Sequence, residues 1–221
     1  MSAPTPAIIF DLDGTLIDSI PDVRGAINRL LVREGRRALS LPEVMTFVGE
    51  GPRPLIERAF AATGHPAAED ELAELIAAYI AFYQAHPADE TRLFPGVPEM
   101  LAGLAGTPLG LCSNKPDEIV RPVIETLDLA RHFGAVVGGN FPRRKPDGEH
   151  LRETLRRMGA EGRPAVMVGD SGTDVAAARD AGIPVLVVSF GYARVPVAEL
   201  GADAILSHFD QLPAALAGLA R

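Results

Sequence analysis

The sequence has little of what several classes of protein depend on. Its 221 residues include one cysteine, Cys112, so no disulfide can form within the chain, which agrees with a reducing compartment. The N-terminal residues lack the basic start and apolar stretch of a signal peptide. Nowhere do the roughly 18 apolar residues of a membrane span run together. We therefore expect a cytoplasmic protein that has no membrane partner.

Positive charge is also scarce. The chain has 21 lysines and arginines against 29 aspartates and glutamates, which gives a formal net charge of −8. A nucleic-acid-binding protein normally has a basic surplus, so nucleic acid is not expected as a partner. An acidic protein that binds an anion has to bring in a cation or gather its few basic residues at one place.

Short apolar runs that end in small or acidic residues recur along the chain. They do not alternate apolar with polar residues, which is typical of strands covered on both faces. From about residue 93 onward, helical patterns alternate with these runs, and one of them, 117–128, contains Pro122, which predicts a late start or a kink. The alternation predicts an α/β fold with a doubly wound parallel sheet and a Rossmann-like core. The apolar runs are 7–10, 109–112, 135–137, 165–168, 184–188 and 204–206.

The segment between the first strand and the rest of the sheet has a helical pattern throughout. Apolar stripes at helical spacing occur over 22–31 and 69–83. A long helical stretch after a single strand indicates an insertion into the sheet-forming chain. We predict a helical cap domain, residues 18–88, inserted into a core that consists of 1–17 plus 89–221.

Polar residues follow four of the predicted strands or their connections, at the sheet edge where open parallel sheets bind ligands. Asp11 and Asp13 come after the first strand, and in extended geometry both side chains can point the same way. Two close carboxylates repel, and a metal ion or a shared proton relieves the repulsion. Oxygen-only ligands favour Mg²⁺. Taken alone, the Asp-x-Asp-Gly sequence fits a turn or helix cap equally well.

The three other clusters are individually weaker. The cluster Ser113-Asn114-Lys115 can hold a phosphate oxygen through a hydroxyl and a main-chain amide, but Ser-Asn is also an ordinary helix N-cap. The Arg143-Arg144-Lys145 run is a basic cluster before a helix, or a solvated face. Asp170 ends a buried strand and Asp174 follows at a helix start, where capping explains Asp174 better than Asp170.

Together, these clusters resemble the four motifs of the haloacid-dehalogenase-like hydrolase superfamily. The matching residues are Asp11-Leu12-Asp13-Gly14-Thr15, Ser113-Asn114, Lys145-Pro146 and Gly169-Asp170-Ser171-x-x-Asp174. The resemblance covers nearly the whole chain, and an inserted helical cap is typical of one subgroup. Segments outside the motifs, such as Phe190-Gly191-Tyr192, are similar to the phosphoglycolate phosphatases, and phosphatases of other sugar phosphates share several of them.

The resemblance implies a Mg²⁺-dependent phosphatase that hydrolyses a small phosphate monoester, most closely 2-phosphoglycolate to glycolate, through an aspartyl-phosphate. It implies that Asp11 is the nucleophile, that Asp13 is the general acid and base, and that Lys145 places a charge on the transferring group. The remaining implied roles are metal binding by Asp11, Asp13 and Asp170, phosphate binding by Ser113, Asn114 and Lys145, and orientation of Lys145 or a metal-bound water by Asp174.

The loop Gly49-Glu50-Gly51-Pro52-Arg53 lies in the predicted cap, and we expect it to reach the non-phosphate end of the substrate and set specificity. Arg53 is a candidate partner for the carboxylate of phosphoglycolate, or else a surface residue. Glu50 would repel that carboxylate if its side chain pointed inward. Gly49 and Gly51 complete this set of candidate specificity residues.

Several alternatives stay open on the sequence. Within the superfamily they are a phosphatase of another sugar phosphate or of pyrophosphate, and a phosphomutase. Haloacid dehalogenation has no use for Asp13 or for the Asp170 and Asp174 pair. The non-enzyme alternative is a regulatory binding module with an acidic pocket. The chain could act as a monomer or a homodimer, and its metal could be Mg²⁺ or Mn²⁺.

Overall fold

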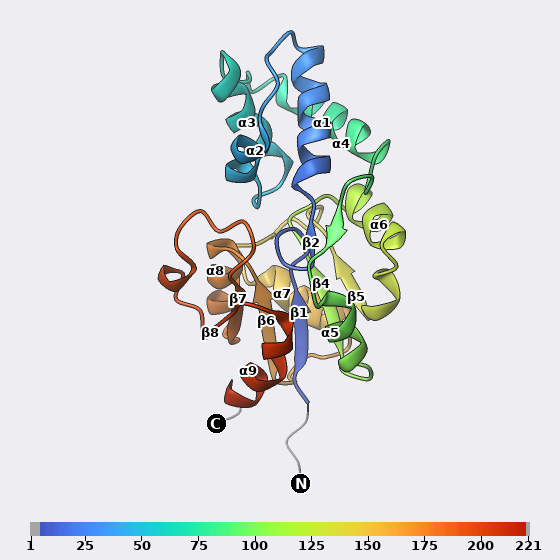
Figure 1. Cartoon of the computed structure of the whole chain (residues 1–221), viewed down its shortest axis with the longest axis vertical. Coiled ribbons are helices and arrows are strands. Elements are labelled where there is room, and N and C mark those ends of the chain that lie inside the picture. The colour runs from blue at the N-terminus through green and yellow to red at the C-terminus, as the bar shows by residue number, and fades with distance from the viewer. Residues whose placement is uncertain (1–4, 220–221) are drawn as a thin grey trace.

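A parallel sheet forms the base of the molecule in the computed structural model, which describes residues 5–219 (Figure 1). Its strands are β1 (Ala7–Phe10), β4 (Leu109–Cys112), β5 (Ala135–Val137), β6 (Ala165–Gly169), β7 (Val185–Val188) and β8 (Ala204–Leu206). They lie in the order β5-β4-β1-β6-β7-β8, and every neighbouring pair is parallel. The order is doubly wound, because the chain moves outward from β1 in one direction and then returns to build the other half. The predicted fold class is therefore confirmed.

Helices cover both faces of this sheet, which explains why its strands are continuous apolar runs. In β1, Ile8 and Phe10 pack into one hydrophobic cluster and Ile9 into another on the opposite face. The first cluster takes in α5 (Val97–Gly103), α6 (Asp117–Thr126) and α9 (Leu212–Leu219). The second takes in α7 (Glu149–Arg157) and α8 (Gly172–Ala181).

Four helices stand above the carboxyl end of the sheet and form the predicted helical cap (Figure 1). The chain enters and leaves them through β2 (Ile17–Asp18) and β3 (Arg92–Leu93), a two-residue antiparallel pair that the sequence did not reveal. Buried Asp22 closes this neck, since its carboxylate accepts the main-chain and hydroxyl protons of Thr91 at 2.7 and 2.6 Å. The exact domain boundaries, 18–88 for the cap and 1–17 plus 89–221 for the core, stay a prediction. The four helices are α1 (Ile20–Arg33), α2 (Leu41–Phe47), α3 (Pro52–Thr63) and α4 (Leu72–Gln84).

The prediction that Pro122 delays or kinks its helix was wrong about the start. Helix α6 begins at Asp117 and continues through Pro122. Proline has no N–H to give to the carbonyl four residues earlier, which is that of Glu118. The side-chain amide of Gln84, at the end of α4, donates to this carbonyl at 3.2 Å. The freed carbonyl thus becomes a polar contact between cap and core.

Short 3₁₀ helices complete the described secondary structure. They are Ala130–His132, Val197–Glu199 and Phe209–Gln211. Within residues 5–219, none of the helices combines the length and the apolar character that crossing a membrane would require.

Candidate active site

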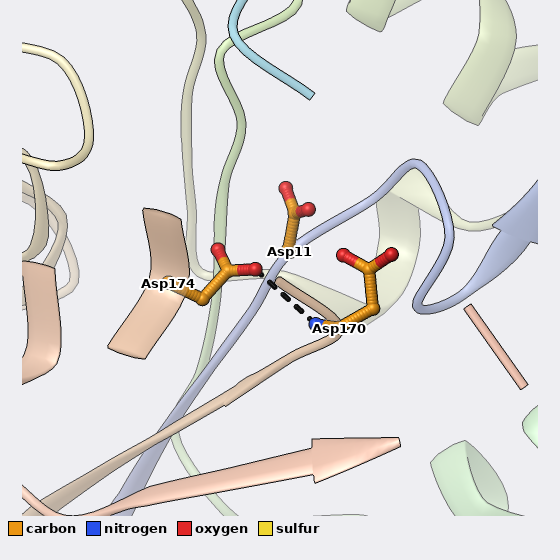
Figure 2. A group of neighbouring side chains, drawn as sticks. All are labelled: Asp11, Asp170 and Asp174. Carbon is orange, nitrogen blue, oxygen red and sulfur yellow. Dashed lines mark hydrogen bonds between the residues drawn. The ribbon is translucent and has the colours of Figure 1, made fainter. Parts of the chain in front are cut away.

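Three aspartates meet at the carboxyl ends of β1 and β6, which are adjacent in the sheet. Asp11 and Asp170 follow these strands directly, and Asp174 lies in the first turn of α8. One carboxylate oxygen from each lies within 4.8 Å of the others, and all three residues are buried. Figure 2 shows the three side chains pointing to the same side of the sheet edge. Aspartates that are far apart in the sequence therefore lie together at one edge of the sheet.

Lys145 sits between two of these aspartates. Its Nζ atom is 2.8 Å from Asp11 Oδ1 and 2.7 Å from Asp174 Oδ1, and the residue is only 3% exposed. Burial alone would lower the pKa of Lys145, but the two carboxylates outweigh it and hold that pKa above its ordinary value. Lys145 is therefore a permanent positive charge beside Asp11.

Asp174 has its oxygens occupied, whereas Asp11 and Asp170 keep capacity for a ligand. Oδ2 of Asp174 accepts from the hydroxyl of Ser171 at 2.7 Å and from the main-chain N–H of Asp170 at 3.2 Å, a bond drawn in Figure 2. Burial, and then the neighbouring Asp174 and Asp11, raise the pKa of Asp170 well above its ordinary value. Burial likewise raises the pKa of Asp11, although Lys145 offsets part of this effect. Three buried carboxylates against one ammonium form an oxygen-only donor set with excess negative charge, which fits a hard divalent cation.

Gly14 and Gly191 allow this crowding around Asp170. A Cβ atom on Gly14 would overlap the carboxylate of Asp170, and Gly14 also has φ +85°, in the region that favours glycine. A Cβ atom on Gly191 would overlap Cβ of Asp170. The next residue, Tyr192, donates its main-chain N–H to Asp170 Oδ2 at 2.5 Å. Small residues on both sides therefore bring Asp170 up to the backbone after β1.

Asp13 occupies a separate polar environment on the cap side of Asp11. The hydroxyl of Ser19 donates to its Oδ1 at 2.5 Å, and Lys115 Nζ lies 2.8 Å from the same oxygen. Lys115 also donates to the phenol oxygen of Tyr83, in α4 of the cap, at 2.7 Å. Cap and core residues thus jointly hold the predicted general acid.

Ser113 and Asn114 follow β4, one strand over from Asp11. The Ser113 hydroxyl oxygen accepts from the main-chain N–H of Lys115 at 3.2 Å, which leaves its proton to donate elsewhere. The side-chain amide of Asn114 donates to the Lys145 carbonyl at 2.9 Å and to the Gly49 carbonyl of the cap loop at 3.3 Å. Asn114 therefore ties the loop of Lys145 to the cap through its side chain.

His150 contacts the main chain of Lys145, and the sequence did not predict this contact. Its Nδ1 accepts the main-chain N–H of Lys145 at 3.1 Å, and its Nε2 lies 3.2 Å from the carbonyl of Gly138. The ring is fully buried. Burial, reinforced by the charge of Lys145, lowers the pKa of His150 to about 4. The neutral ring with its proton on Nε2 satisfies both contacts.

This buried histidine predicts an acid-dependent loss of stability. A folded-state pKa below the unfolded value makes its contribution complete above about pH 6.5, and protonation removes it as the pH falls toward 4. Between pH 7 and pH 5, His150 should cost about 2 kcal/mol of unfolding free energy, which His150→Asn should abolish. Urea unfolding at both pH values measures this, with His65→Asn at an exposed position as the control. Equal losses in wild type and His150→Asn would contradict it.

A cavity of about 40 Å³ lies between the cap and these strand ends. Its core side is formed by polar residues, including Asp11, Asp13, Ser113 and Lys115. Its cap side is mainly apolar and includes Val23, Val48, Leu55 and Tyr79, from α1, the loop before α3, α3 and α4. The carboxylates of Asp11 and Asp13 therefore share this cavity with an apolar wall from the cap.

The predicted specificity loop divides between this cavity and the surface. Gly49 and Gly51 line the cavity, whereas Glu50 and Arg53 are not among its lining residues. Glu50 forms ion pairs with Arg58 of the cap, at 2.7 Å, and with Arg194 of the core, at 2.5 Å. Its charge therefore stabilises the contact between cap and core. Arg53 forms ion pairs with Glu57 and Glu69, at 2.9 and 2.7 Å, and its side chain is 46% exposed.

The sequence analysis assigned no role to Lys115, His150 or Tyr192, although the structure places all three around the site. One compositional signal could have found Lys115. The chain contains two lysines, Lys115 and Lys145, whereas its other 19 basic residues are arginines. Both lysines are buried at this site. No comparable signal marks His150, whose contacts depend on the path of the loop before α7.

Comparison with known proteins identifies the class of hydrolase to which this fold and this site belong. The family model described as "Haloacid dehalogenase-like hydrolase" matches residues 8–188. The chain belongs to the haloacid dehalogenase-like hydrolase family. The expectation of an enzyme from this family is thereby confirmed.

Individual relatives have names that are more specific than the name of the family. The phosphoglycolate phosphatase of Caulobacter vibrioides is 42% identical over 211 residues, which are 94% of this chain and 89% of that protein. The phosphoglycolate phosphatase of Rhodospirillum rubrum is 43% identical over 213 residues, or 93% and 88% of the two chains. The crystal structure of a predicted phosphoglycolate phosphatase from Haemophilus somnus is 30% identical, with a TM-score of 0.88 over 97% of this chain and 98% of that one. The resemblance to phosphoglycolate phosphatases is confirmed.

Proposed function

We propose that this chain is a Mg²⁺-dependent phosphatase that hydrolyses 2-phosphoglycolate to glycolate and phosphate through an aspartyl-phosphate. The observation that best supports it is the position of Lys145, whose ammonium joins Asp11 and Asp174 beside the buried carboxylate of Asp170. This arrangement combines a carboxylate nucleophile with positive charge for a phosphate and oxygen ligands for a cation. The relatives named above support the choice of substrate.

In the first half-reaction, Asp11 attacks phosphorus and the bond from phosphorus to the glycolate oxygen breaks. Asp13 passes its proton to that oxygen, and glycolate leaves. Lys145 stabilises the negative charge on the transferring group. The Ser113 hydroxyl and the main-chain N–H of Asn114 hold phosphate oxygens, since the Asn114 side chain is engaged elsewhere. Asp11 is left as the aspartyl-phosphate.

In the second half-reaction, a water molecule loses a proton to Asp13 and attacks phosphorus. The bond between phosphorus and Asp11 breaks, which restores both aspartates and yields inorganic phosphate. Asp11, the main-chain carbonyl of Asp13 and Asp170 are the residues that would hold Mg²⁺, which supplies the positive charge a dianionic phosphate needs to approach these carboxylates. Residues 18–88, as the cap, exclude bulk water from the cavity during the first step.

A phosphate-release screen tests this proposal. The purified chain is assayed with 2-phosphoglycolate, ethyl phosphate, a hexose phosphate, pyrophosphate and a nucleoside monophosphate, each with Mg²⁺ and with EDTA. We expect 2-phosphoglycolate to have the highest kcat/KM by at least about tenfold, and EDTA to remove the activity until Mg²⁺ is restored. Absence of phosphate release from every compound in the presence of Mg²⁺ would contradict the proposed function.

A further inference from the structure

Lys115 lies inside the cavity, but no step of the proposed reaction uses it. It is the one basic residue among the described residues that line this space, and it is 7% exposed. Its neighbours in the lining include Tyr79 and Ile119, which offer no charge. A buried ammonium is costly unless an anion accompanies it. Lys115 therefore requires a negatively charged group close to its ammonium.

In the structure that anion is Asp13, whose Oδ1 lies 2.8 Å from the Lys115 ammonium. The ammonium of Lys115 has three N–H donors, and among the described residues Asp13 and Tyr83 accept two of them. The third donor is available to a negative group on the substrate. This step of the inference rests on the proposed function.

The carboxylate of 2-phosphoglycolate is in the right place to be that group. Its carbon is two bonds from the ester oxygen that Asp13 protonates, so it must lie next to Asp13. Lys115 is bonded to Asp13 on the cavity side. Arg53, the candidate from sequence, has both its ion-pair partners elsewhere. We propose that Lys115 binds the substrate carboxylate and selects phosphate monoesters with a carboxylate on the phosphate-bearing carbon.

The cap contributes to this subsite through Tyr83. Its phenol oxygen accepts from Lys115 Nζ at 2.7 Å, and the ammonium lies 4.4 Å from the centroid of its ring. Tyr83 in turn packs edge-on against Tyr79, with 6.0 Å between ring centroids. Both tyrosines belong to α4. The carboxylate subsite is therefore complete only when the cap stands over the core, which couples substrate selection to cap closure.

The test compares two substrates of equal length in Lys115→Met, Lys115→Arg and wild-type enzyme. The substrates are 2-phosphoglycolate and ethyl phosphate, in which a methyl group replaces the carboxylate. Lys115→Met should lower kcat/KM for 2-phosphoglycolate by about 100-fold, mainly through KM, because a desolvated ion pair is lost. For ethyl phosphate the loss should be at least about tenfold smaller, and Lys115→Arg should recover part of the preference. Glycolate should also inhibit Lys115→Met more weakly than wild type.

Lys115 also touches Asp13, so the ratio between the two substrates is the decisive readout. Equal losses on both substrates, with unchanged inhibition by glycolate, would show that Lys115 acts only through Asp13 and would overturn this inference. A wild-type enzyme that hydrolyses ethyl phosphate but not 2-phosphoglycolate would overturn both the substrate and the role of Lys115. Failure to hydrolyse any ester would overturn the proposed function itself. Arg121→Met, at an exposed position in α6, removes one positive charge from the surface and is the matched control. It should leave the ratio of kcat/KM for the two substrates unchanged.

Discussion

Replacing Asp11 with asparagine is expected to lower phosphate release by on the order of 10⁴-fold or more, because the proposed nucleophile is removed. Asparagine has nearly the same shape, so it preserves the packing after β1, but its amide is a poor nucleophile and a poor ligand for a cation. Initial rates of phosphate release from 2-phosphoglycolate with Mg²⁺ measure the effect. Asp210→Asn, whose side chain is 73% exposed, removes one surface carboxylate that does not line the cavity and should retain the wild-type rate.

A second measurement separates loss of the nucleophile from loss of the fold. Wild-type enzyme quenched in acid during turnover of ³²P-labelled substrate should retain label on the protein, and Asp11→Asn should retain none. The variant should unfold at a urea concentration at least as high as wild type, because burial raises the pKa of Asp11 and makes its charge costly. Wild-type turnover by a folded Asp11→Asn enzyme would contradict the assignment of Asp11 as the nucleophile.

The core of the fold could be predicted because its signal is local. A run such as Ala165–Gly169 is apolar at successive positions since helices cover both faces of β6. The paired strands β2 and β3 could not be predicted, because each has two residues and they meet across the whole cap. Their pairing depends on where the cap helices return the chain. Two residues are too few to show the alternation of a strand.

The candidate site was predictable to the extent that strand ends determine it. Asp11 and Asp170 converge because their strands are neighbours, which follows from the doubly wound topology. The contacts of Lys115 with Asp13 and Tyr83 could not be derived, since they require the position of α4 above the core. Long-range packing of this kind leaves no periodic trace in the sequence.

Arg53 is the opposite case, because its contact with Glu57 follows from a local pattern in the sequence. Helix α3 begins at Pro52, so Arg53 stands four residues before Glu57 on the same helical face. That spacing alone favours an ion pair along the helix surface. Lys115 directly follows Ser113-Asn114 in the sequence, and in the structure it lines the same cavity as Asp11 and Asp13.

Replacing Lys145 with methionine should lower both activity and stability. Mg²⁺ should restore part of the stability but none of the activity. Loss of its charge beside Asp11 should lower kcat on the order of 10³-fold, since the group proposed to stabilise the transferring phosphate is removed. The same change leaves Asp11 and Asp174 buried without their ammonium partner. Breaking a buried ion pair in this way typically costs about 3–5 kcal/mol of unfolding free energy.

Urea unfolding in EDTA and in Mg²⁺ tests the two effects together. In EDTA, Lys145→Met should be destabilised by the full amount, whereas Mg²⁺ should restore part of the loss, because a cation that binds only the folded site stabilises it. Activity should not return with Mg²⁺, since a metal ion held by the carboxylates would not replace the ammonium that the proposed mechanism places on the phosphate. Arg143→Met, two residues earlier and 61% exposed, removes a charge from the same loop and should be nearly neutral. A Lys145→Met enzyme as stable as wild type in EDTA would show that the buried aspartates do not depend on Lys145 for their charge balance.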